Sequence, residues 1–271
     1  MTVRVLGLLG SAESAAILSD IETLEHPSAH GTLLIRHGYL NGQEVVVFPR
    51  SGPRHPLPAH SIDARENIQI LKSYGVTDVI SSGMTGSLRP SIPVGSVLVL
   101  DQFLDFTRVP RPTFFDDDEF GFVDFSEPFC SRLRGDLVAG FRDIGVPAIP
   151  SGCYAGVDGP RFETSAEVRM FAQLGGDVVG CTVLPECVYA REAGLHYATV
   201  AGVVNLGAGL QAGPLHAPDW LAMREEHMAS IAAVLDVVTK AMAGSQTEQR
   251  GCDCPPIAYE RVRDTAEAIS V

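Results

Sequence analysis

Three segments of the chain hold most of the side chains that could act on a small polar ligand. Glu163 lies in residues 159–167 (GPRFETSAE), Thr182 in residues 180–186 (GCTVLPE) and Asn205 in residues 204–209 (VNLGAG). A carboxylate accepts hydrogen bonds, whereas a hydroxyl and an amide both donate and accept them. Read singly, a glutamate at a helix start and an asparagine at a strand end have ordinary structural roles. Together they could recognise a heterocycle that carries a ring N–H and a carbonyl oxygen.

Taken in order, the three segments resemble the base- and ribose-binding elements of trimeric purine nucleoside phosphorylases and their relatives, the methylthioadenosine phosphorylases. The resemblance covers residues 3–242. It implies that Glu163, which follows Phe162 as in the Phe-Glu-Thr-x-Ala-Glu pattern of 6-oxopurine-specific members, accepts from the ring N–H of hypoxanthine or guanine. Asn205 would bond the purine oxygen and N7, where the adenine-specific branch carries aspartate. Glu163 and Asn205 are thus the expected catalytic residues, with Phe162 packed on the ring face.

The same resemblance places three residues around the sugar. Cys181 stands where the family usually has methionine under the ribose, and His216 resembles the histidine that reaches the 5′-hydroxyl. Phe122 matches an aromatic residue that a neighbouring subunit contributes to the sugar pocket. An exposed loop histidine and a core or interface phenylalanine remain alternatives.

A phosphate site is implied at Ser11, Arg50, Met84 and Thr182. Hydroxyl groups, a guanidinium and backbone N–H groups make a suitable cradle for an anion. Arg50 is expected to contribute most, because it brings a full positive charge and a bidentate fork. Met84 lies with Gly83 in residues 81–86, which are expected to form a third phosphate loop.

The phosphate pattern also departs from that of the family. No histidine follows Arg50 directly, Gly83 offers no side chain, and Glu13 brings a negative charge close to the anion. Arg54 and His55 could compensate.

The leading interpretation is phosphorolysis of a 6-oxopurine nucleoside to a free base and a pentose 1-phosphate. One alternative is a methylthio-nucleoside (methylthioinosine or methylthioadenosine) phosphorylase, since residues 101–105 and 126–130 look closer to that branch. Others are a nucleoside hydrolase and a nucleoside-binding protein without turnover. The choices between hypoxanthine and guanine and between ribose, deoxyribose and a 5′-modified sugar stay open.

Alternating strands and helices must position these residues, and they predict one α/β domain with a central mixed, mostly parallel sheet flanked by helices. The domain is expected to span residues 1–243, followed by a polar tail at 244–271. Asn41-Gly42 predicts a hairpin turn between two strands. Gly83 and Gly86 indicate a loop, and residues 110–128 an ordered but irregular excursion. The expected strands are residues 3–9, 31–40, 43–49, 77–82, 96–100, 148–157, 177–181 and 196–204, and the expected helices are 62–74, 130–144, 165–174, 185–193 and 218–242.

Composition limits the partners. A net charge of −13 without a basic cluster argues against nucleic acid, and no apolar run is long enough to span a bilayer. The start of the chain lacks a signal-peptide pattern and the six cysteines are scattered, so we expect a cytoplasmic protein with reduced thiols. The resemblance to the trimeric phosphorylases implies a homotrimer. Cys252 and Cys254 offer only two ligands and are expected to be free surface thiols. No metal or organic cofactor is expected, with phosphate as co-substrate.

Overall fold

The structure is a computed structural model that describes residues 4–10, 12–28, 31–51, 57–108, 113–115, 119–215, 219–244, 252, 254 and 259–261. Ser11 and His216, two of the predicted site residues, lie outside the described residues. The same holds for Arg54, His55 and the side chain of Glu13.

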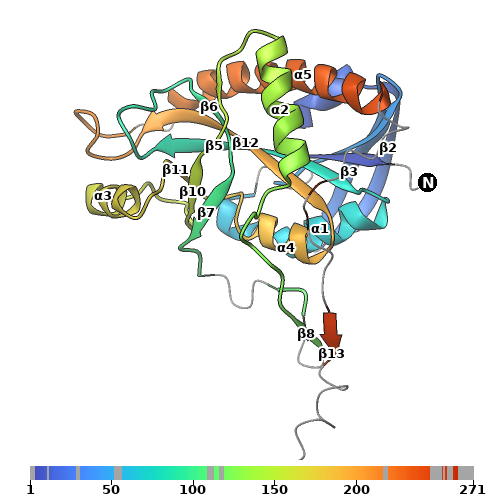
Figure 1. Ribbon diagram of the computed structural model, residues 1–271, viewed down its shortest axis with the longest axis horizontal. Coiled ribbons are helices and arrows are strands. Elements are labelled where there is room, and N and C mark those ends of the chain that lie inside the picture. Colours follow the sequence, from blue (N-terminus) through green and yellow to red (C-terminus); the bar gives the residue numbers. More distant parts are fainter. Residues whose placement is uncertain are drawn as a thin grey trace, which may run out of the picture.

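One large mixed sheet forms the centre of the molecule (Figure 1). Parallel pairs join β1 to β4 and β5, β5 to β12, β10 to β7 and β11, and β6 to β9, whereas β2–β3, β3–β4, β5–β11 and β6–β12 are antiparallel. The mixed, mostly parallel α/β fold predicted from the sequence is therefore confirmed. The strands are β1 (Val5–Leu9), β2 (Ser19–Ser28), β3 (Gly31–Leu40), β4 (Gln43–Phe48), β5 (Asp78–Ser87), β6 (Val97–Val99), β7 (Gln102–Asp105), β9 (Ala148–Ile149), β10 (Cys153–Gly156), β11 (Val178–Gly180) and β12 (His196–Leu206).

Helices cover both faces of this sheet. In Figure 1, α2 (Ser131–Asp143) and α5 (Asp219–Gly244) lie above it, and α1 (Ala64–Ser73) and α4 (Glu186–Glu192) lie below it. α3 (Ser165–Gln173) lies at one end of the sheet. The buried apolar side chains follow this division, since Leu137 of α2 and Leu235 of α5 share one core cluster, and Ile68 of α1 and Ala190 of α4 share another. The helices turn their polar faces outward and pack their apolar faces on the strands.

Local signals place several of these elements. Asn41 and Gly42 both have positive φ, 52° and 79°, which is the geometry of a tight hairpin turn and confirms the prediction between β3 and β4. The Asp63 carboxylate accepts from the Glu66 backbone N–H at 2.8 Å and so begins α1. α3 begins with a reciprocal capping box between Thr164 and Glu167.

The prediction that Gly83 and Gly86 lie in a loop is wrong, because both are inside β5. A Cβ atom on Gly86 would lie 3.1 Å from Asn205 Nδ2, and one on Gly83 would lie 3.3 Å from Thr182 Oγ1. The two glycines therefore allow neighbouring side chains to approach the strand closely, which is the other common reason for glycine in a strand.

Further differences from the prediction concern short or exposed elements. β2 is mostly exposed and lacks an apolar face, so the sequence did not reveal it. The predicted strand at 148–157 is divided into β9 and β10. β8 (Glu119–Gly121), inside the predicted irregular excursion, pairs with β13 (Tyr259–Arg261) below the main sheet in Figure 1. Two 3₁₀ turns, at Ala12–Ile17 and Ala59–Ser61, complete the described elements.

α5 ends at Gly244, close to the predicted boundary at residue 243, and the division of the chain into domain and tail stays a prediction. No helix in the described ranges has both the length and the apolar character to cross a membrane.

Candidate active site

The candidate site lies where two strands approach each other along one edge of β5. β1 pairs with residues 78–81 of β5 in parallel, and β11 pairs with residues 86–87 in the antiparallel direction. The carboxyl ends of β1 and β11 therefore face each other across residues 82–85. Ligands in open α/β sheets bind at such points, where the strand order changes direction.

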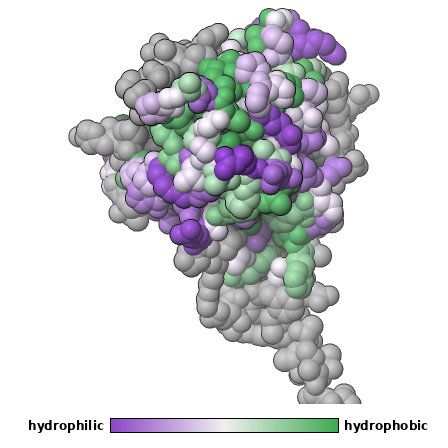
Figure 2. Space-filling view, turned by 90° about the vertical axis from the view of Figure 1, so that its left-hand side faces the viewer, coloured by the Kyte–Doolittle hydropathy of each residue, from purple (hydrophilic) through white to green (hydrophobic). Residues whose placement is uncertain are grey.

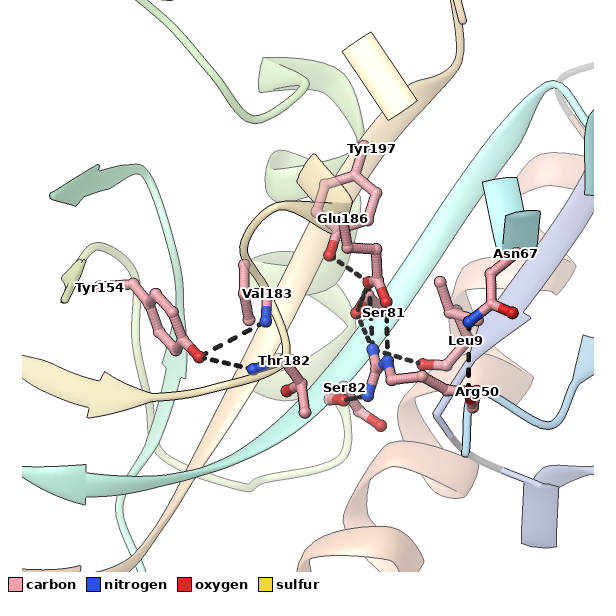
Figure 3. Close-up of polar contacts among 10 residues, drawn as sticks. All are labelled: Leu9, Arg50, Asn67, Ser81, Ser82, Tyr154, Thr182, Val183, Glu186 and Tyr197. Atoms are coloured by element: carbon pink, nitrogen blue, oxygen red, sulfur yellow. Dashed lines mark hydrogen bonds and ion pairs between the residues drawn. The ribbon is translucent and has the colours of Figure 1, made fainter. Parts of the chain in front are cut away.

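Arg50 and Glu186 form the centre of a buried polar network at one end of this site (Figure 3). Arg50 donates from Nε and Nη2 to the Glu186 carboxylate at 2.7 and 3.1 Å. Its Nη1 donates to the Ser82 carbonyl at 2.7 Å. Glu186 Oε1 also accepts from Ser81 Oγ at 2.8 Å and from the Tyr197 hydroxyl at 2.5 Å.

The network keeps both charges in the interior. The Arg50 and Glu186 side chains are 6% and 1% exposed. Burial alone would lower the pKa of Arg50, but the Glu186 carboxylate raises it above its ordinary value, so that the guanidinium stays charged. The expectation that Arg50 offers its bidentate fork to an anion is therefore wrong, because Glu186 occupies that fork.

Arg50 still reaches the anion side of the site through Nη1. A Cβ atom on Gly10, which has a φ of +87°, would overlap this nitrogen. Gly10 directly follows β1, so Nη1 lies against the loop in which the sequence predicts the first phosphate contact. Glu186 was not identified from the sequence, although it ends the segment GCTVLPE. Its signal was a glutamate at the start of a helix, followed by the apolar run at residues 187–190.

Thr182 lies next to this network and is held by a buried tyrosine. The Tyr154 hydroxyl accepts from the backbone N–H groups of Thr182 and Val183 at 3.1 and 3.4 Å (Figure 3). Tyr154 is fully buried, and burial raises the pKa of its phenol, so the group stays neutral. The Thr182 hydroxyl is thereby fixed close to Gly83, at the junction of β1 and β11.

Cys181 interacts electrostatically with both charged residues of the site, Glu163 and Arg50. Burial raises the pKa of its thiol, the Glu163 carboxylate raises it further, and the Arg50 guanidinium lowers it. Cys181 is thus within electrostatic reach of both, and it lines a hollow of about 610 Å³ together with Arg108 and Asp158.

Glu163 marks the opposite end of the site. It lines a hollow of about 290 Å³ that adjoins the larger one along Arg108 and Asp158. Burial raises the pKa of its carboxyl group, and the nearby Glu167 adds to this effect. The loop before α3 is fixed by Arg161, which donates to both oxygens of Glu167 at 2.7 and 2.8 Å.

Asn205 is aimed by an irregularity in β12. The pairing with β5 shifts by one residue between Val203 and Asn205, so that Asn205 opposes Gly86. Such a bulge turns the following side chain to a new direction and is frequent beside active sites. Asn205 Nδ2 donates to the Leu206 carbonyl at 2.9 Å, and an amide nitrogen has a second N–H for a ligand.

The loop after β12 packs directly on the start of α3. Gly207 lies against Val168, and a Cβ atom on Gly209 would lie 2.6 Å from Ser165 Oγ. This contact brings the segment that carries Asn205 against the one that carries Glu163. Neither Asn205 nor Thr182 lines the two hollows; their places follow from these packing contacts.

Phe162 and Met84 line neither hollow, and Phe122, which the resemblance assigns to the sugar pocket of a neighbouring subunit, is exposed. Phe162 is 44% exposed and lines neither hollow, whereas Phe106 and Phe171, with ring centroids 4.6 Å apart, line the smaller one. Phe122 is 85% exposed. Met84 lies within β5, and its side chain packs against the core cluster under α2 and α5. The expected loop at 81–86 is a strand, and the role of Met84 in phosphate binding stays a prediction.

Comparisons with known proteins agree with this arrangement. The family model described as "Phosphorylase superfamily" matches residues 4–240. A probable 6-oxopurine nucleoside phosphorylase of Moorella thermoacetica is 36% identical over 256 residues, with 94% of this chain and 96% of the relative covered. A probable S-methyl-5′-thioinosine phosphorylase of Thermodesulfovibrio yellowstonii is 33% identical over 253 residues, with 93% and 94% covered. The methylthioadenosine phosphorylase of Schistosoma mansoni, solved with adenine, has the same fold, with a TM-score of 0.83 at 24% identity and 92% and 94% coverage.

The chain therefore belongs to the phosphorylase superfamily. Within it, the relatives place the chain in the purine nucleoside phosphorylase family of pentosyltransferases, whose members here divide between 6-oxopurine nucleoside and methylthio-nucleoside phosphorylases.

Proposed function

We propose that this enzyme cleaves the N-glycosidic bond of a 6-oxopurine nucleoside with phosphate, giving the free base and a pentose 1-phosphate. The observation that carries the proposal is the pairing of a carboxylate and an amide at the base end of the site, with the Asn205 segment packed on the Glu163 segment. The S-methyl-5′-thioinosine relative supports the same base, because the sulfur of that nucleoside is on the sugar and its base is hypoxanthine, a 6-oxopurine.

In the proposed reaction, Glu163 and Asn205 read and activate the base. The Glu163 carboxylate accepts from the ring N–H, and the Asn205 amide donates to the purine oxygen and accepts from N7 as it gains a proton. Their interactions with the departing base strengthen as the bond breaks, which stabilises the transition state.

The attacking phosphate lies at the opposite end, against Gly10, Thr182 and Arg50 Nη1. Because Glu186 already neutralises most of the Arg50 charge, this cradle relies on hydroxyl and backbone N–H donors. We expect weaker phosphate binding than a cradle with an unpaired arginine would give. Ser11 and His216 keep their predicted roles in the phosphate and 5′-hydroxyl contacts.

A methylthioinosine substrate is the second candidate. The hollow of about 610 Å³ beside Cys181 has room for more than a ribose, and one of the relatives is named for this substrate. The base contacts are the same for inosine and methylthioinosine, so the choice depends on the 5′-group alone.

We also propose a cytoplasmic homotrimer in which Phe122 completes the sugar pocket of a neighbouring subunit. The Phe122 side chain is 85% exposed, so most of its surface is accessible to a second chain. Figure 2 shows hydrophobic residues among hydrophilic ones on the side of the molecule where α3 lies, and Phe162, Met170 and Leu174 are exposed there. Light scattering that reports a fully active monomer would contradict this assembly.

The decisive experiment measures inosine cleavage with and without phosphate. We expect cleavage only with phosphate, and a higher kcat/KM for inosine or methylthioinosine than for adenosine or methylthioadenosine. Equal rates without phosphate would identify a hydrolase, and binding without cleavage in either condition would identify a nucleoside-binding protein. A preference for the adenine nucleosides would overturn the assignment of Glu163 and Asn205.

A further inference from the structure

Four potential metal ligands from three distant parts of the chain meet away from the active site. Cys130, His196, Cys252 and Cys254 each offer one ligand atom, and these atoms all lie within 4.8 Å of one another. His196 Nδ1 is 3.3 Å from Cys252 Sγ and 3.7 Å from Cys130 Sγ. Among the described residues, no other group of three or more such side chains is found.

The core of the protein holds two of these ligands in place. Cys130 is 1% exposed and precedes α2, and its backbone N–H donates to the Tyr197 carbonyl at 2.8 Å. His196 opens β12, and its backbone N–H donates to the Thr77 carbonyl at 3.0 Å. These two side chains therefore have fixed positions before the segment beyond α5 joins them.

The other two ligands come from the segment beyond α5. The structure differs here from the expectation of free surface thiols, because Cys252 and Cys254 are half-buried and pack against the core cluster under α2 and α5. In the sequence, only Cys252 and Cys254 of these four ligands lie close to each other. The fold brings Cys130 and His196 to them.

The two nitrogen–sulfur distances fit a tetrahedral zinc site. With Zn–S of about 2.3 Å and Zn–N of about 2.0 Å, neighbouring sulfur and nitrogen ligands lie about 3.6 Å apart, and two sulfur ligands about 3.8 Å apart. The distances of 3.3 and 3.7 Å from His196 Nδ1 to two sulfurs lie on either side of the first value. A Cys₃His set is a usual ligand set of structural zinc sites.

The surroundings also suit a site with a net negative charge. Three thiolates around one Zn²⁺ leave one negative charge, and Arg132 lies close enough to Cys130 to interact with it electrostatically. Arg132 pairs with Asp78, and its buried Nη1, which makes no hydrogen bond among the described residues, is 3.8 Å from the Asp136 carboxylate. Such an N–H group could donate to a coordinated sulfur, as residues around metal ligands commonly do.

We propose that Cys130, His196, Cys252 and Cys254 bind one structural zinc ion, which ties the chain beyond α5 to the main sheet. His196 lies at the first residue of β12, and Asn205 lies near its last. Asn205 is nine positions further along the extended chain, or about 30 Å away. The ion therefore stabilises the fold and takes no part in the reaction at the other end of the strand. This inference does not depend on which nucleoside the enzyme cleaves.

The test uses the full chain without an affinity tag that binds metal, purified with a reductant and without chelator. Elemental analysis should find about one zinc per chain. Thiol titration in denaturant with chelator should find all six cysteines reduced. Removal of the zinc should lower the midpoint of thermal unfolding by several degrees, and added Zn²⁺ should restore it. Cobalt(II) added to the metal-free protein should give the visible absorption of a tetrahedral, thiolate-rich site.

Variants separate the site from the other thiols. Cys254→Ser and, independently, Cys252→Ser should lower the zinc content at least tenfold and leave kcat for the nucleoside within about twofold. Cys153→Ser, which removes a half-exposed cysteine outside the cluster, is the matched control and should retain zinc.

Two results would overturn the proposal. One is wild-type protein without zinc that also fails to take up zinc or cobalt after reduction. The other is a thiol count two below six in the non-reduced protein, which would indicate a disulfide within the cluster instead of a metal. If both tail variants fail to fold, the reversible removal and return of zinc in the wild-type protein still decides the question.

Discussion

Glu163 and Arg50, the charged side chains at the two ends of the site, have very different surroundings. Glu163 lines a hollow, and burial raises the pKa of its carboxyl group. Arg50 is enclosed, and the Glu186 carboxylate accepts two of its hydrogen bonds. The base end thus keeps a carboxylate for the ligand, whereas the anion end uses most of its charge inside the protein.

This difference separates two ways of binding a polar ligand. An ionic group that faces a hollow discriminates between ligands by the hydrogen bonds that each ligand can form with it. A ligand that leaves this group without a partner loses binding free energy. A buried ion pair fixes the positions of its neighbours and contributes little net charge to the ligand. We expect substitutions at the base end to change selectivity, and substitutions in the Arg50–Glu186 pair to change the fold.

The largest effect is expected for Glu186→Ala. The change leaves the buried Arg50 guanidinium without its partner, which typically costs about 3–5 kcal/mol of unfolding free energy. Urea unfolding of the two proteins measures the difference. Glu167→Gln, at the partly exposed pair with Arg161, is the control and should cost less. Equal losses for the two variants would remove the distinction between the two ends.

The second effect concerns the base. Asn205→Asp removes the N–H group that donates a hydrogen bond to the purine oxygen. It should lower kcat/KM for inosine by about 5- to 150-fold, which corresponds to a loss of roughly 1–3 kcal/mol of transition-state stabilisation. Turnover of adenosine should rise relative to inosine, because a carboxylate accepts from the exocyclic amine.

Asn205→Ala is the matched control for that substitution. It removes the contact without adding an acceptor, so it should slow inosine and adenosine cleavage alike. An Asn205→Asp variant that keeps the wild-type preference for inosine would show that this residue does not read the base.

A third, smaller effect is expected at Thr182. Arg50→Ala cannot isolate phosphate binding, because it would also leave Glu186 buried and unpaired. Thr182→Val removes one hydroxyl and leaves the backbone contacts to Tyr154 in place. It should raise the KM for phosphate by about 2- to 10-fold, as expected for a single hydrogen bond, with the KM for inosine unchanged.

Thr182→Ser is the control for that experiment, since it keeps the hydroxyl. Steady-state kinetics with each substrate varied in turn give both constants. If Thr182→Val raised the KM for the nucleoside instead, the anion and sugar positions would have to be exchanged.

The segments that carry Glu163 and Asn205 could be recognised in the sequence because their information is local, and their role in binding the base stays a prediction. Glu163 lies in one continuous segment that ends in a capping box, and Asn205 lies in another that ends in two glycines. Helix caps and the alternation of strands and helices depend on neighbouring residues, so most of the elements were also predicted with small errors at their ends.

The anion end could not be predicted, because its contacts join residues that are far apart in the chain. Arg50 and Glu186 are separated by 136 positions, and nothing near either residue indicates the other. In the sequence alone, Gly83 indicates a loop. Its contact with Thr182, which explains a glycine inside a strand, is visible only in the fold. The same limit applies to the cysteine and histidine cluster. His196 and Cys252 are 56 positions apart, so the sequence does not show that they belong to one set of ligands.

The smallest effect is a shift in pH dependence at the base end. Only the ionised carboxyl of Glu163 accepts from the ring N–H, and burial raises its pKa above the ordinary value of about 4.3. Affinity for hypoxanthine should therefore be full above the raised pKa and fall as the pH drops through it, at a higher pH than an exposed glutamate would give. Binding of the base without phosphate, followed by titration calorimetry, avoids the ionisation of phosphate itself. Glu163→Gln should bind hypoxanthine more weakly and show no such acid limb, because its amide does not titrate. If the acid limb persists in Glu163→Gln, another group is responsible for the titration. Glu163 would then contribute to base binding through its shape and not through its charge.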